Sequence, residues 1–121
     1  MARRLADLPL FDDLQIALLR EALDEADLAA MMAELPGAVA TATEAIVAAA
    51  DSGDLPEARR AAHVLKGVAG SFGAARLAGA ALEIEQDLET IADVVATLPA
   101  LAAIVDQTTA SLPTVVRQPR G

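Results

Sequence analysis

The chain has 121 residues, 55% of them of hydrophobic type, and a formal net charge of −9. This length and composition suit one domain with a packed core, and the acidic surplus argues against a nucleic-acid partner, because binding a phosphate backbone needs Lys and Arg. The absence of cysteine excludes disulfides, thiolate metal sites and a cysteine nucleophile.

Neither a secretion signal nor a membrane segment is expected from the apolar pattern. Asp7 and Asp12 interrupt the first apolar stretch, and no stretch approaches the roughly 18 uncharged apolar residues of a membrane span. A soluble cytoplasmic protein is therefore expected. Aromatic residues make up only 2% of the chain, and the bias to Ala and Leu favours closely packed helices over a sheet.

The first half of the chain predicts two helices. A short one spans about 12–23, where apolar residues recur at helical spacing. The acidic residues 24–27 suit the start of a second helix, because carboxylates stabilise the positive end of the helix dipole. This helix extends to about Ala50, and Pro36 and Gly37 inside it would kink or divide it.

The second half predicts three more helices. Asp54 is a good N-cap for a helix that ends near Gly70, and "SFGAA" makes a turn or a kink before a helix over about 74–88. The last helix lies within 91–112 and ends at Pro113.

These boundaries make residues 1–112 one domain and residues 113–121 a flexible tail. Short connections between amphipathic helices favour antiparallel neighbours. The predicted fold class is all-α, an antiparallel up-down four-helix bundle with a short additional N-terminal helix.

Positive charge is concentrated in one window of the chain. Residues 58–82 hold no acidic residue and four basic ones, Arg59, Arg60, Lys66 and Arg76, whereas the rest of the chain has five basic and eighteen acidic residues. The window is either a chance cluster on a solvated helix face or a local site for an anion.

The single histidine, His63, lies in this window and points away from the predicted core. With about 100° per residue, the residues on the opposite, core-facing side are Ala61, Leu65, Val68, Ala69 and Phe72. Arg59 and Lys66 flank His63, and Gly67 and Gly70 share its face. Glycine in a helix is roughly 0.5–1 kcal/mol worse than alanine, so the bare strip indicates a surface that another protein approaches closely.

Several chemistries can be compared for an exposed imidazole with cations beside it. Zinc sites need three or four ligands, and Ser71 lacks the strained turn of a hydrolase nucleophile. Neutral imidazole is, however, a good nucleophile near pH 7. A phosphoryl group on the ring would be an anion that Lys66 and the arginines partly neutralise, and the partner would bring the metal.

The stretch "HVLKGVAGSFGAARLAGAALEIE", 63–85, resembles the signature of histidine-containing phosphotransfer (HPt) domains, approximately H-x-L-K-G-x-x-x-x-x-G-x-x-x-L closed by an apolar-Glu or apolar-Gln pair. The matching residues are His63, Leu65, Lys66, Gly67, Gly73, Leu77, Ile84 and Glu85. The resemblance implies a four-helix bundle with an extra short helix, whose exposed histidine accepts a phosphoryl group from a receiver-domain aspartate and passes it to another.

By this resemblance His63 is the phosphoacceptor, Lys66 steadies the phosphoryl charge and Gly67 admits the receiver. Glu85 stands where relatives commonly have a Gln that hydrogen-bonds the imidazole. It would hold one ring nitrogen as N–H, although its charge would repel a phosphoryl group, and the alternative is a solvated glutamate. The residues expected to bind the receiver are Arg59, Arg60, Gly67, Gly70 and Arg76.

The expected partners are response-regulator receiver domains or a hybrid histidine kinase, and the chain resembles a free-standing HPt protein or a piece of such a kinase. It would act as a monomeric carrier rather than an enzyme, with no bound cofactor and with Mg²⁺ in the partner receiver. Two alternatives remain, a docking module that binds a receiver or kinase without transferring phosphate, and an Ala-rich bundle with an inert histidine.

Overall fold

Helices make up the regular structure of residues 5–117, the part of the chain that the computed structural model describes. In chain order they are a 3₁₀ turn η1 (Leu5–Asp7), α1 (Asp13–Ala22), α2 (Glu25–Asp51), α3 (Leu55–Ser71), α4 (Ala75–Leu82), a π-helical turn η2 (Glu83–Asp87) and α5 (Ile91–Arg117). The prediction of an all-α chain is confirmed.

Aspartate side chains begin the first three α-helices. Asp12 accepts hydrogen bonds from two backbone N–H groups of α1, at 3.0 and 3.2 Å. Asp24 and Asp54 cap α2 and α3 in the same way, at 2.8 and 3.0 Å. Each such cap satisfies a backbone donor at the helix start and contributes about 1 kcal/mol. The cap predicted at Asp54 is confirmed.

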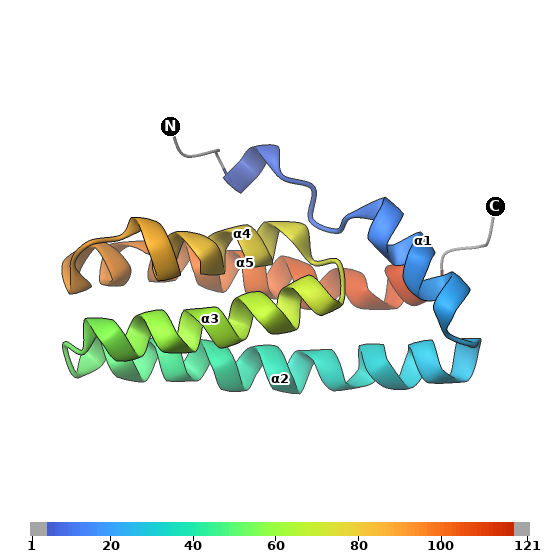
Figure 1. Cartoon of the computed structure of the whole chain (residues 1–121), viewed down its shortest axis with the longest axis horizontal. Coiled ribbons are helices and arrows are strands. Elements are labelled where there is room, and N and C mark those ends of the chain that lie inside the picture. The colour runs from blue at the N-terminus through green and yellow to red at the C-terminus, as the bar shows by residue number, and fades with distance from the viewer. Residues whose placement is uncertain (1–4, 118–121) are drawn as a thin grey trace.

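α2, α3, α4 with η2, and α5 lie alongside one another, and the chain reverses direction from each to the next (Figure 1). α3 packs against α2, α4 and η2, and α5 packs against α2 and α4. α1 crosses the end of the molecule where α2 begins and α5 ends (Figure 1). The largest fully buried apolar side chains are Leu35, Val39, Ile46, Leu65, Leu77, Ile84, Val94 and Leu101. A buried Leu or Ile of this kind contributes about 1.5–3 kcal/mol, so the core between these helices fixes the face that α3 leaves exposed.

α2 runs unbroken through Pro36 and Gly37. The predicted alternative of a division at these residues is therefore wrong. Pro36 removes a single backbone donor, and Leu35 and Val39 on either side are each 1% exposed. Burial of this apolar face offsets the missing hydrogen bond.

The prediction that Pro113 ends the last helix is also wrong, because α5 continues to Arg117. Leu112 is buried, Val115 packs against the core, and Arg20 of α1 donates a hydrogen bond to the Val115 carbonyl. These contacts stabilise the last turn of α5, although Pro113 removes one backbone hydrogen-bond donor from it. Of the predicted tail, residues 118–121 lie outside the described residues.

α5 also qualifies the expectation that the chain has no membrane segment. By length and composition, Ile91–Val115 could cross a membrane, with a mean hydropathy of 1.4 over an 18-residue window of which 22% is buried. Asp93 and Asp106 interrupt its uncharged stretch. Its buried side chains, Val94 and Leu101 among them, belong to the same core as those of α2 and α3.

The connection between α3 and α4 is a tight turn at Gly73. This glycine has a φ of 70°, in the left-handed region that costs other residues roughly 1–2 kcal/mol. A Cβ atom here would also lie 3.3 Å from the Ile16 Cδ1 atom of α1. Of the two predicted forms of the "SFGAA" connection, a turn or a kink, the structure has the turn.

Candidate functional site

His63 projects from the outer face of α3. Its side chain is 65% exposed, whereas the residues predicted to face the core are buried or, for Val68, half-buried. The buried ones are Ala61, Leu65, Ala69 and Phe72. The predicted outward orientation of the imidazole is therefore confirmed.

Glu85, from the π-helical turn η2, joins His63 to Lys66. One carboxylate oxygen, Oε2, lies 2.6 Å from His63 Nδ1, and the other, Oε1, lies 2.7 Å from Lys66 Nζ. The Glu85 side chain is only 18% exposed. The alternative of a solvated glutamate at this position is thus wrong, and the hydrogen bond expected between Glu85 and the imidazole is present.

This contact determines which ring nitrogen is free to react. A carboxylate can only accept, so the hydrogen bond requires the proton of a neutral His63 ring to sit on Nδ1. The lone pair is then on Nε2, and within residues 5–117 no group forms a hydrogen bond with that atom. The site is an exposed imidazole whose free lone pair lies on Nε2.

The Lys66 ammonium, hydrogen-bonded to Glu85, lowers the pKa of that carboxyl below its usual 4.5, and the hydrogen bond from His63 adds to this effect against the opposing effect of burial. Glu85 is therefore ionised at neutral pH and can hold the Nδ1 proton.

We expect Lys66→Met to raise the pKa of Glu85 toward 4.5, because it removes the largest cause of the depression. A depressed carboxyl pKa stabilises the fold above the unfolded pKa, and this contribution is lost as the pH falls through the folded value. As the pH falls from 4.5 through the folded pKa of Glu85, the variant should thus lose less stability than the unaltered protein. Titration of the carboxyl ¹³C resonance measures the shift, and Lys66→Arg is the control that keeps the cation. An unchanged midpoint in Lys66→Met would contradict this assignment.

Glu85 reaches α3 from a turn that sequence reasoning missed. The prediction was one continuous helix over 74–88, but α4 ends at Leu82, and the Leu88 N–H donates to the Glu83 carbonyl, five residues back, at 3.0 Å. π-turns of this kind are rare in helices and occur often at functional sites. The apolar spacing of the segment is that of an ordinary helix, so no signal in the sequence identified the turn.

The four cations of the basic window do not gather around His63. Lys66 alone among them contacts the Glu85–His63 pair within the described chain. Arg59 donates to the Leu88 carbonyl at 2.9 Å, and Arg60 forms an exposed ion pair with Glu57. The receiver-binding roles of Arg59 and Arg60 stay predictions.

Arg76 lies on α4 and has a contact of a different kind. Its Nε and Nη2 atoms donate to the Leu8 carbonyl at 3.0 and 2.9 Å, which ties the N-terminal segment to α4. The structure therefore does not bring Arg76 to the imidazole, and its expected part in binding a receiver stays a prediction.

The glycines on the histidine face have open space where their side chains would be. A Cβ atom added at Gly67 or Gly70 would meet no atom within 4 Å. Gly67 is exposed, and the Gly70 carbonyl accepts a hydrogen bond from Gln15 of α1. The described part of the fold has room for a side chain at both positions, and the expected part of these glycines in admitting a receiver stays a prediction.

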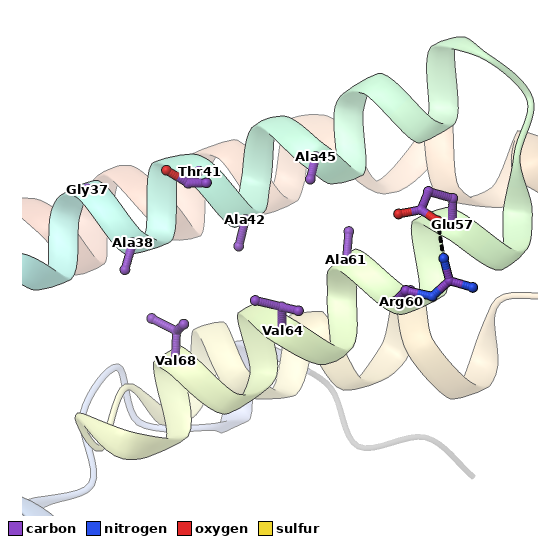
Figure 2. A pocket seen from close by; sticks show the side chains of 10 residues that line it. All are labelled: Gly37, Ala38, Thr41, Ala42, Ala45, Glu57, Arg60, Ala61, Val64 and Val68. Atoms are coloured by element: carbon purple, nitrogen blue, oxygen red, sulfur yellow. Dashed lines mark hydrogen bonds and ion pairs between the residues drawn. The ribbon is translucent and has the colours of Figure 1, made fainter.

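A shallow hollow of about 510 Å³ adjoins the imidazole, with Ala38, Val64 and Gly67 among its lining residues. It shares Ala38, Val64 and Val68 with a longer groove of about 490 Å³ between α2 and α3. Figure 2 shows small and β-branched side chains facing each other across that groove, with the Glu57–Arg60 pair at one end. The α2 side of this surface was missed, although the small residues Gly37, Thr41 and Ala45 recur along α2 at a helical spacing.

The chain matches a family of known proteins. The family model described as Hpt domain matches residues 10–112, which is most of the chain. No curated protein and no solved structure matches.

Within residues 5–117 no three His, Asp or Glu side chains lie together as a metal site would require.

Proposed function

The chain belongs to the Hpt domain family, whose members take part in two-component phosphotransfer, and we propose that it is a phosphorelay intermediate. It accepts a phosphoryl group on His63 from the aspartate of a receiver domain, or from a kinase, and passes the group to the aspartate of another receiver. The observation that carries this proposal is the hydrogen bond from Nδ1 to Glu85, which leaves Nε2 exposed as the nucleophile.

Transfer from a receiver is a displacement at phosphorus. The Nε2 lone pair attacks, the P–N bond forms, and the P–O bond to the aspartate breaks, so that the carboxylate leaves with the electron pair. No proton has to move during this step, because the ring proton already sits on Nδ1. The product is a phosphorylated imidazolium, and return of the phosphoryl group to a second aspartate is the same step in reverse.

Glu85 has two opposing effects on that product. Its carboxylate stabilises the positive charge of the imidazolium ring through Nδ1 at 2.6 Å, but it repels the phosphoryl oxygens. The phosphoryl group would sit on Nε2, across the ring from Glu85, and Lys66 neutralises the carboxylate from its other side at 2.7 Å. This geometry favours stabilisation of the ring charge over repulsion.

We place the receiver on the surface formed by the hollow beside His63 and the α2–α3 groove. Gly67 would let the receiver backbone come close to the ring, and exposed Val64 supplies apolar area. The receiver would contribute its acidic pocket and Mg²⁺, so this chain carries the phosphoryl group and needs no cofactor of its own. We further propose a monomer that works in the cytoplasm, without nucleic-acid or membrane partners.

We also assign the helices to an antiparallel up-down four-helix bundle, in which α4 and η2 together form one of the four members and α1 is the additional short helix. The alternating directions of successive helices in Figure 1 support this assignment. The fold then presents His63 from the middle of α3, which packs against α2 and against the member formed by α4 and η2.

Incubation with ³²P-phosphorylated receiver domains of the source organism tests the proposal. We expect label to pass to this chain from one or more of them, and the label should be lost in acid and retained in alkali, as a phosphoramidate requires. An acid-stable label, or no transfer from any receiver, would contradict the proposal. Tight binding without label would instead favour the alternative of a docking module that does not transfer phosphate.

A further inference from the structure

Three side chains of α3 hold the π-helical turn that carries Glu85. Arg59, His63 and Lys66 stand four and three residues apart, which places them along one side of α3. His63 and Lys66 bind the Glu85 carboxylate, and Arg59 Nη2 donates to the Leu88 carbonyl at 2.9 Å. The turn is thus held at its centre by Glu85 and at its end by Arg59.

The backbone connects these two points within a few residues. The Leu88 N–H makes the hydrogen bond to the Glu83 carbonyl that defines the π-turn, at 3.0 Å, and the Leu88 C=O is the acceptor of Arg59. Beyond Leu88, whose own backbone is already extended with φ −84° and ψ 128°, the chain leaves the helix. A carbonyl at a helix end has no partner within the helix, so Arg59 supplies the partner that stabilises this end of the turn.

Part of the Arg59 guanidinium is buried away from water, which argues against an incidental surface contact. Its Nε atom is buried and has no hydrogen-bond partner, a situation that costs free energy. The neighbouring Arg60 shows the ordinary alternative, with a 70% exposed side chain paired to Glu57. The position of Arg59 therefore combines an unfavourable burial of Nε with the hydrogen bond from Nη2 to the Leu88 carbonyl.

We propose that Arg59 is a positioning residue, which holds the π-turn through the Leu88 carbonyl and thereby keeps the Glu85 carboxylate on His63 Nδ1. The effect of Arg59 on phosphoryl transfer through Nε2 rests on the proposed function. The positioning of Glu85 by Arg59 can be measured in the unphosphorylated protein. Without Arg59 the end of the turn would loosen, and Glu85 would spend less time within hydrogen-bonding distance of the ring.

The direct test is the tautomer of His63 in Arg59→Gln, read from long-range ¹H–¹⁵N spectra of the imidazole. His63 is the only histidine in the sequence, so its signals need no further assignment. In the unaltered protein we expect the Nδ1–H form to dominate above neutral pH. In Arg59→Gln we expect its ratio to the Nε2–H form to fall severalfold, toward the ratio in Glu85→Ala, and Arg59→Lys should restore part of it because lysine can still donate to Leu88.

Arg60→Gln is the matched control, because it removes the same charge from the next position of α3 without touching η2. It should leave the tautomer ratio unchanged. An unchanged ratio in Arg59→Gln, or equal changes in both variants, would overturn the proposal whatever the transfer assay gives. A backbone spectrum of each variant checks the fold, and Arg59→Lys keeps the test decisive if Arg59→Gln unfolds.

Transfer kinetics then separate this inference from the proposed function. If His63 is the phosphoacceptor, Arg59→Gln should lower the transfer rate about tenfold, less than the roughly 100-fold that a 1 Å misplacement of reacting groups can cost. A changed tautomer ratio with no labelling of the unaltered protein would support the positioning role and contradict the phosphorelay role.

Discussion

His63→Gln is expected to abolish labelling by a phosphorylated receiver, leaving only background. The amide has no nucleophilic lone pair comparable to that of Nε2, so the P–N bond cannot form. The amide N–H of the glutamine can still donate to Glu85 in place of His63 Nδ1, which lies 2.6 Å from the carboxylate. The 2.7 Å contact between Lys66 and Glu85 is unchanged. Because the histidine side chain is 65% exposed, the free energy of unfolding should change by no more than about 0.5 kcal/mol.

Transfer of ³²P followed by gel autoradiography, with urea unfolding of the same samples, measures both parts of this prediction. Binding to the receiver should persist in His63→Gln, which separates loss of chemistry from loss of docking. Label that remains in this variant would show that a residue other than His63 accepts the phosphoryl group. A variant that fails to fold would contradict the outward, solvent-exposed placement of the ring.

Gly67→Leu is expected to weaken receiver binding by about ten- to a hundredfold while leaving the fold intact. A Cβ atom at this position meets no atom within 4 Å, so the leucine would project into the hollow beside His63 where the receiver is proposed to sit. Forcing extra methyl and methylene groups into a packed contact costs typically 1–3 kcal/mol, which corresponds to this loss of affinity. The helix itself should become more stable by up to about 1 kcal/mol, because leucine is a better helix former than glycine.

Isothermal titration with the cognate receiver and thermal unfolding of the variant test these two effects together. Gly67→Ala should stabilise the helix at least as much as Gly67→Leu, because alanine is the best helix former, and it should lose less affinity because its side chain is smaller. Ala103→Leu on the exposed side of α5 is a matched control, because it adds a leucine to an exposed helix position outside the hollow and the groove. Unchanged binding by Gly67→Leu would contradict the role of the bare glycine face, and with it the docking surface proposed here.

Much of the site could be predicted from residues close together in the sequence. His63, Lys66, Gly67 and Gly70 lie within three turns of one helix, and helical geometry alone places them on a common face. The Asp54 cap and the φ of Gly73 also follow from local rules, because each concerns the backbone of a few adjacent residues. The match to the family's signature then connected this face with Ile84 and Glu85, which lie twenty-one and twenty-two residues after His63.

The positions of the other charged residues could not be read in this way. Arg59 and Arg76 look like neighbours of the histidine in the charge pattern, yet each donates to a backbone carbonyl of another element, Leu88 and Leu8. Charge counting treats every cation as a free surface group, whereas a nearby unpaired carbonyl competes for the guanidinium once the helices pack. The same applies to the end of α5, where Arg20 and the core hold a turn beyond Pro113.

The sequence by itself determined the helical class, the outward histidine and the bare glycine face, because amphipathic periodicity and glycine chemistry act over a few residues. Only the tertiary structure decided which ring nitrogen is free. That choice depends on the carboxylate of Glu85, twenty-two residues after His63, which the π-turn η2 places 2.6 Å from Nδ1. The packing of η2 against α3 sets this distance. A hydrogen bond is lost with a displacement of about 1 Å, which is finer than any periodicity in the sequence can specify.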